Sequence, residues 1–98
     1  MDFQDAVRDL AELPRKATIY VPYEETVVNA STPVLLVQGD DTPPAGYRYL
    51  LEVLIAREVL EVWTSWRDNR EPSLEEACEA IIYYAENDAY QPEDDSLE

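Results

Sequence analysis

Carboxylates are the side chains with which this chain could do chemistry. Its 98 residues include 22 Asp and Glu against 7 Lys and Arg, with no His and a single Cys, Cys78. Without imidazole, the usual general base of acid–base and nucleophilic catalysis is missing. One thiol is too few for a disulfide framework or a thiolate zinc site. We therefore expect a protein that is not an enzyme and uses no metal or cofactor. The chemistry left to it is electrostatic binding.

Two other carboxylate chemistries fit the sequence poorly. A pair of carboxyl groups can hydrolyse glycosides, but nothing here places two of them in an apolar cleft. Asp40 and Asp41 stand together in a proline-rich loop and could bind Ca²⁺. Their spacing is not that of an EF-hand loop, which alternates its ligands and closes with Glu. A turn is the favoured interpretation, and it leaves Asp40 and Asp41 as acids that a partner could contact.

The negative charge is concentrated near the C-terminal end of the chain. The formal net charge is −15, and residues 71–98 hold ten of the 22 acids and no base. Residues 1–70 hold the other acids together with all of the Lys and Arg. Phosphate binding needs clustered bases, so nucleic acid is excluded as the default partner. A basic protein is the partner that this charge favours.

A helix is expected from Leu74 to about Asn87. It opens with a capping box, in which the Ser73 hydroxyl can accept from the amide of Glu76 while the Glu76 side chain reaches back. At 100° per residue, apolar residues gather on one side and acids with tyrosines on the other. The apolar side comprises Leu74, Ala77, Cys78, Ile81, Ile82 and Ala85, and the acidic side Glu75, Glu76, Glu79, Tyr83, Glu86 and Tyr90.

The acidic side of this helix is the predicted partner-binding surface, with Asp40 and Asp41 as a further candidate. Tyr83 lies in the middle of it, and tyrosine is favoured at binding hot spots because it offers rigid contact area and one hydroxyl. The surrounding acids would steer a basic partner and raise its association rate. The alternative stays open that this is an ordinary solvated helix face, with Tyr83 lying flat on neighbouring stems.

The remaining pattern predicts the elements that must position this helix. Apolar residues at spacings of three and four predict a first helix over Asp2 to Leu13, ended by Pro14. β-Branched and aromatic runs predict strands over Thr18 to Pro22, Pro33 to Gln38 and Tyr47 to Glu52. The second run is apolar on both faces, which is typical of a central strand. From Val53 the period becomes helical and continues to about Asp68, with Trp63 and Trp66 both on the core side.

The order helix, three strands, helix, helix predicts an α+β fold: a small three-stranded antiparallel sheet covered by three helices. Both glycines of the chain, Gly39 and Gly46, flank one loop, which suggests that it connects neighbouring strands. We expect a single domain over residues 1–90 and an acidic, flexible tail over 91–98.

Neither the start of the chain nor its apolar stretches suggest a membrane or an exported protein. The opening MDFQDAVRDL has no basic n-region and no apolar h-region. The longest near-apolar stretch, Tyr47 to Ala56, is interrupted by Arg48 and Glu52 and is too short for a bilayer span. A cytoplasmic protein is expected, and a lone Cys fits that compartment.

Short motifs along the chain resemble a known family. They are Ile19-Tyr20-Val21-Pro22, then Thr32-Pro33 opening an apolar strand, then Pro72-Ser73-x-Glu75-Glu76, then Ala80-x-x-Tyr83-Tyr84-x-x-Asn87-Asp88-Ala89-Tyr90. From about Leu10 to Tyr90 this pattern resembles short acidic bacterial immunity proteins of contact-dependent growth inhibition and related polymorphic toxin systems. The resemblance implies a protein that binds and neutralises one cognate toxin domain, often a basic nuclease, inside the producing cell, in a one-to-one complex. It assigns no binding residue.

Two other functions remain open. One is a nucleic-acid mimic that inhibits a restriction or defence nuclease, which would need carboxylates spaced like phosphates along an extended surface. The other is a regulatory adaptor that binds a protein without using its charge.

Overall fold

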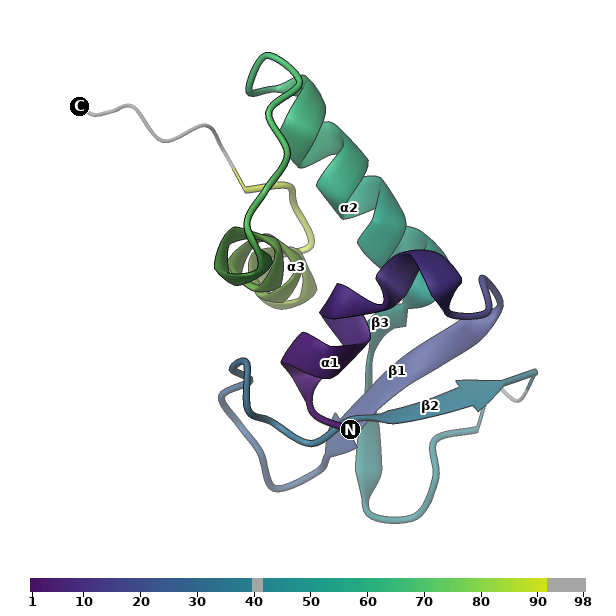
Figure 1. Cartoon of the computed structure of the whole chain (residues 1–98). Helices are drawn as coiled ribbons and strands as arrows, with labels where there is room; N and C mark the ends of the chain where they lie inside the picture. Colours follow the sequence, from purple (N-terminus) through teal and green to yellow (C-terminus); the bar gives the residue numbers. More distant parts are fainter. Residues whose placement is uncertain (40–41, 92–98) are drawn as a thin grey trace.

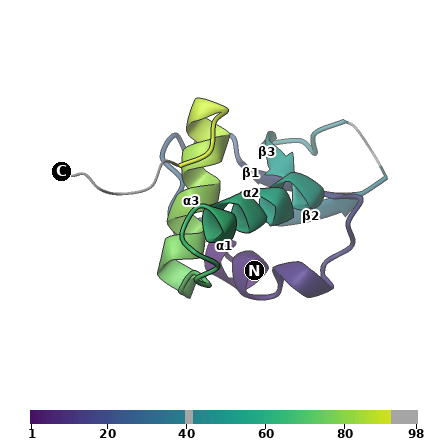
Figure 2. The same ribbon diagram turned by 90° about the horizontal axis from the view of Figure 1, so that it is seen from above.

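The computed structural model describes residues 1–39 and 42–91 and has the predicted α+β class. A first helix is followed by three antiparallel strands and two further helices, which is the predicted order. The helices lie on one side of the sheet (Figures 1 and 2). The elements are α1 (Phe3–Arg8), a 3-10 turn η1 (Leu10–Glu12), β1 (Ala17–Pro22), β2 (Leu35–Gln38), β3 (Tyr47–Glu52), α2 (Val53–Ser65) and α3 (Leu74–Asn87).

The sheet has the order β2-β1-β3, so the first strand is the central one. The prediction that Pro33 to Gln38 forms the central strand was wrong. Consecutive burial of Ile19, Tyr20 and Val21 shows that β1 is covered on both faces, whereas Leu35 at the start of β2 is exposed. An apolar run of four residues does not distinguish an edge strand over a core from a strand buried on both faces.

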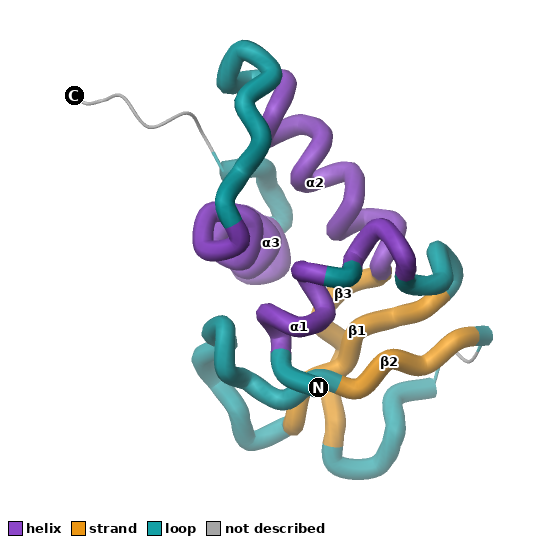
Figure 3. The backbone as a smooth tube through the Cα atoms, viewed as in Figure 1, coloured by secondary structure: helices purple, strands orange, loops and turns teal. Residues whose placement is uncertain are grey.

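The prediction that the loop between the two glycines joins neighbouring strands was wrong. The loop runs from β2 to β3, and β1 lies between them (Figure 3). Gly39 and Gly46 begin and end this connection with φ angles of 84° and 83°. Glycine adopts such angles without the steric cost that a Cβ brings. The glycines therefore mark the two sharp turns of a crossover connection.

A β-bulge in β3 decides which of its side chains are buried. Ile19 pairs with Leu51 and Tyr20 with Tyr49, so Leu50 has no partner across the ladder. The extra residue shifts the alternation of the strand. Leu50 and Leu51 are consequently both buried, and Tyr49 is left 49% exposed.

The first helix is shorter than predicted, and an arginine from α2 bonds to the 3-10 turn that follows it. Asp2 and Asp5 form a capping box at its start, but α-helix gives way to the 3-10 turn after Arg8. Arg57 donates to the carbonyl oxygens of Leu10 and Leu13. A guanidinium is a favourable partner for the unsatisfied carbonyls at the end of a helix. It ties this segment to α2.

The two tryptophans of α2 have different environments. Trp63 is 5% exposed and belongs to the core, as predicted, but Trp66 is 47% exposed. The helix ends at Ser65 rather than near Asp68. Asp68 and Asn69 then have left-handed backbone angles that turn the chain towards α3. Trp66 is the C-cap residue just beyond the helix. Its side chain is exposed because the apolar stripe of the helix no longer faces the core there.

The core is formed between the sheet and the helices. It includes Phe3 of α1, Ile19 of β1, Leu51 of β3, Val53 of α2 and Ile81 of α3, all nearly inaccessible to water. α3 packs against both α1 and α2. Within residues 1–39 and 42–91, no helix combines the length and apolar character needed to cross a bilayer.

Replacing Trp63 with Ala should destabilise the protein by about 3–5 kcal/mol, because it removes a buried aromatic side chain and leaves a cavity. Trp66→Ala is the matched control and should cost only about 0.5–1.5 kcal/mol, which is the range for an aromatic pair at the surface. Urea unfolding followed by circular dichroism measures both values. Equal losses in the two variants would contradict the placement of Trp63 in the core.

Candidate functional site

The third helix begins where the sequence predicts and is held there by two reciprocal hydrogen bonds. The amide of Glu76 donates to the Ser73 hydroxyl over 3.1 Å, and the amide of Ser73 donates to the Glu76 carboxylate over 3.0 Å. The helix ends at Asn87, and Asp88 adopts the left-handed conformation common at C-terminal caps. Its bounds, Leu74–Asn87, agree with the predicted ones.

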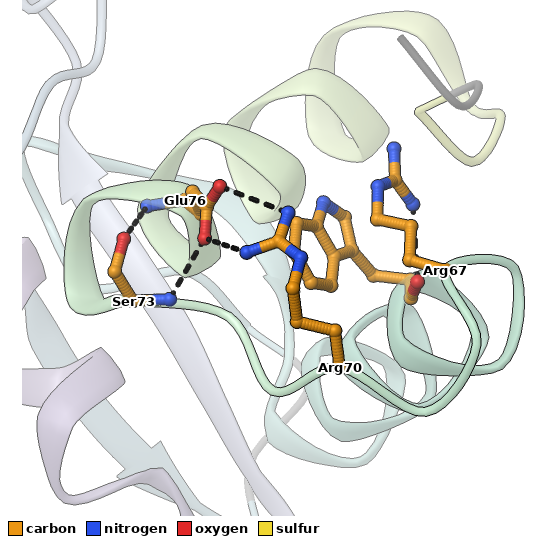
Figure 4. A network of polar contacts seen from close by, with 5 residues as sticks. Arg67, Arg70, Ser73 and Glu76 are labelled. Atoms are coloured by element: carbon orange, nitrogen blue, oxygen red, sulfur yellow. Dashed lines mark hydrogen bonds and ion pairs between the residues drawn. The ribbon is translucent and has the colours of Figure 1, made fainter.

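Glu76 has a second partner within the chain, which separates it from the other predicted binding residues. The Arg70 guanidinium donates to both of its carboxylate oxygens, over 3.1 and 3.2 Å (Figure 4). Arg70 and the Ser73 amide together hold the pKa of Glu76 below its ordinary value. The carboxylate thus positions α3 in this structure.

The same arginine stacks on the core tryptophan. Arg70 lies 4.7 Å from the centre of the Trp63 ring, and Arg67 lies 4.3 Å from it. Figure 4 shows both guanidinium groups beside the indole, from the turn that joins α2 to α3. Cation–π contacts of this kind are favourable by about 0.5–2 kcal/mol each. They hold the turn against the core, and Arg70 also binds Glu76 at the N-terminus of α3.

A groove of about 830 Å³ runs along α3 and contains four of the predicted binding residues. One wall and the floor come from α3, and the opposite wall comes from the start of α1 and from the loop between β1 and β2. Gln91, just after α3, also borders the groove. The lining from α3 is Leu74, Glu75, Cys78, Glu79, Ile82, Tyr83 and Glu86, and the opposite wall is Gln4, Val28, Asn29 and Ala30.

Local hydrogen bonds give the opposite wall its shape. The Asn29 amide donates to the Thr32 hydroxyl over 2.9 Å, and the Ser31 amide donates to the Asn29 side chain over 2.8 Å. The backbone amide of Gln4 donates to the Ala30 carbonyl over 3.0 Å, which ties this loop to the first turn of α1. No motif in the sequence marks residues 28–30 as part of a site, because only the fold brings them opposite α3.

The groove combines an apolar floor with acids on one side only. Cys78 is buried and Ile82 half-buried at the floor, whereas Glu75, Glu79 and Glu86 are exposed. The described residues that line it include no Lys or Arg. Like charges on successive turns repel one another slightly. A cationic group entering the groove would relieve this repulsion while covering the apolar floor.

Cys78 lies beneath this surface as a small apolar residue. It is 4% exposed, and burial raises the pKa of its thiol. A raised pKa leaves little of the reactive thiolate at neutral pH. This fits the expectation that Cys78 is an inert packing residue.

Tyr90 is not part of the groove lining. It lies beyond the end of α3, and its ring packs edge-on against Trp66 at 6.0 Å and beside Tyr84 at 5.3 Å. Burial, with a smaller effect from Asp88, raises the pKa of the Tyr84 hydroxyl.

Asp40 and Asp41 lie outside the described residues, as do residues 92–98 of the predicted tail.

Most positive charges of the chain are engaged in internal contacts. Arg8 pairs with Asp5 at 2.9 Å, and Arg48 donates to the Glu25 carbonyl over 2.8 Å. Arg57, Arg67 and Arg70 make the contacts described above, whereas Arg15 and Lys16 are exposed. Arg48, Arg57 and Arg67 donate to backbone carbonyls. The ion pairs of Arg8 and Arg70 do not involve Glu75, Glu79 or Glu86.

Comparisons with protein-family models, with curated proteins and with solved structures return no match for this chain. In the part of the chain that the structure describes, no three His, Cys, Asp or Glu side chains are grouped to hold a metal ion.

Glu76→Gln should lower stability at neutral pH, because Gln keeps the capping geometry but loses the ion pair with Arg70. The lowered pKa of the Glu76 carboxyl stabilises the fold at pH values above the ordinary carboxyl pKa of 4.5. The contribution disappears as the pH falls through the lowered pKa. Urea unfolding at several pH values should therefore show the gap to the parent protein closing in acid. Glu75→Gln removes the same charge one residue away and should cost less. A gap that is constant with pH would contradict the role of the ion pair.

Proposed function

We propose that this protein is an immunity protein that binds one cognate toxin domain, of the basic nuclease type, and neutralises it in the cytoplasm of the producing cell. The observation that carries the proposal is the groove along α3. It joins a floor around Cys78 and Ile82 to three glutamates and Tyr83, with no described base in the lining. The short motifs that resemble bacterial immunity proteins support the same function.

Charge complementarity explains how such a surface would inhibit. A nuclease binds phosphates through clustered Lys and Arg. Carboxylates that pair with those side chains occupy the positions that the substrate backbone needs. Close charge pairs at protein interfaces have measured coupling energies of about 1.5–7 kcal/mol. A few such pairs around one tyrosine anchor are enough for a tight one-to-one complex.

The arrangement of the acids favours this function over a nucleic-acid mimic. Glu75, Glu79 and Glu86 lie along one wall of a single groove whose other wall is neutral. A mimic needs carboxylates along both sides of an extended surface, and it would inhibit several nucleases. An immunity protein inhibits one. An adaptor without an electrostatic role would bind equally well after charge reversal at these positions.

Tyr83→Ala combined with Glu79→Lys should weaken binding of the cognate toxin domain by about 30-fold or more, because loss of a hot-spot residue costs at least about 2 kcal/mol. The ligand for the titration is the basic C-terminal domain of the large secreted protein expected from the neighbouring reading frame. Isothermal titration calorimetry gives the affinity and the stoichiometry. Glu12→Lys, which makes the same charge change on the exposed end of η1, is the matched control.

Three outcomes of these measurements would contradict the proposal. The absence of any basic toxin domain among the products of the neighbouring reading frames would remove its partner. Inhibition of several unrelated nucleases would indicate a mimic. Unchanged affinity in the double variant, with its fold intact by circular dichroism, would move the interface elsewhere, and the Asp40–Asp41 loop would be the next candidate.

Salt should act mainly on the rate of association. Raising the ionic strength from about 0.1 M to about 1 M shortens the Debye length from about 10 Å to about 3 Å. The association rate constant should then fall by about tenfold or more, while dissociation changes little. Surface plasmon resonance measures both rates. Glu79→Lys should flatten this dependence, and a salt-independent association rate would rule out electrostatic steering.

A further inference from the structure

The lining of the groove defines what kind of structural element can enter it. Its α3 residues belong to two rows in which successive members are four residues apart. One row is Leu74, Cys78, Ile82 and Glu86, and the other is Glu75, Glu79 and Tyr83. Rows of this kind form the ridges between which the side chains of a second helix pack. α1 and α2 both pack against α3, and the groove lies between α3, the start of α1 and the loop after β1.

The spacing of the acids distinguishes a helix from an extended strand as the occupant. Glu75 and Glu79 are separated by about 6 Å along the axis of α3, and Glu79 and Glu86 by about 10.5 Å. On a helix lying along α3, cations at positions i, i+4 and i+11 reproduce both intervals. On a strand, side chains of one face recur about every 6.8 Å, which matches the first interval but not the second.

The two walls differ in charge, and this sets the pattern of the occupant. The acids stand on the α3 wall, while Gln4, Asn29 and Ala30 form a neutral opposite wall. The occupant must therefore carry its cations on one flank only. Its underside must be apolar, because Cys78 is buried and Ile82 is half-buried on the core side of the acids.

We infer that the element of the partner that binds in this groove is an amphipathic helix with Lys or Arg along one flank and a large apolar side chain on its underside. The inference, which rests on the proposed function, names the recognition element of the partner. The apolar side chain contacts Cys78 and Ile82. The cations pair with Glu75, Glu79 and Glu86.

The test uses the full chain and three fluorescein-labelled synthetic peptides. The first is a helical peptide with a leucine stripe and Lys at positions i, i+4 and i+11. The second has the same composition in shuffled order, and the third carries a central proline that breaks the helix. Fluorescence anisotropy at constant ionic strength should show the first peptide binding about tenfold or more tightly than either of the others.

Variants of the protein show whether the peptide binds in the groove. Glu79→Lys should weaken binding of the first peptide by about tenfold or more, and Glu12→Lys should leave it unchanged. Glu79→Gln is a milder second variant and should give a smaller loss in the same direction. Circular dichroism and urea unfolding verify that each variant is folded.

Equal binding of the three peptides would overturn the inference, because net charge alone would then account for it. Displacement of the first peptide by spermidine at similar concentration would also overturn it, in favour of a small polycation. Neither result contradicts the proposed function, which is tested by binding of the toxin domain itself. A toxin domain that binds the parent protein but not the Tyr83→Ala, Glu79→Lys variant would keep that function even if no helical peptide is preferred.

Discussion

The candidate site depends on the position of α3, which is held by its buried apolar face and by the contact between Arg70 and Glu76. This contact holds the N-terminus of α3 against the turn that follows α2, while the same guanidinium stacks on Trp63 of the core. A helix rotates by about 100° per residue, so fixing its first turn fixes the direction of every later side chain. Together with the buried face of α3, which includes Ala77 and Ile81, this contact sets the direction in which the acids of the groove point.

A chain with a formal net charge of −15 must still form a stable core. Its arginines help by donating to backbone carbonyls and by stacking on an aromatic ring, as Arg57, Arg48 and Arg67 do. These contacts satisfy polar groups that would otherwise be costly to bury. The described residues that line the groove include no Lys or Arg, and this unbalanced charge is what a basic partner would meet.

The groove is a product of three segments that are distant along the chain. α3 supplies the acids and the floor, α1 supplies Gln4, and the loop after β1 supplies Val28 to Ala30. The tie between the Gln4 amide and the Ala30 carbonyl holds the last two together. A flat acidic helix face thereby becomes a recess that can exclude water from a bound side chain. Charge pairs gain strength where water is excluded.

Local features of the sequence determined the bounds of α3 and β3, the capping box at Ser73, the α+β class and the charge of the α3 surface. Each depends on hydrogen bonds or periodicities that span three or four residues, or on the order of such elements. Only the tertiary structure decided that β1 is central, that Trp66 is exposed, and that Glu76 and Tyr90 separate from the groove residues. Those outcomes depend on which distant segment packs against each side chain, and a bulge or an arginine elsewhere in the chain changes them.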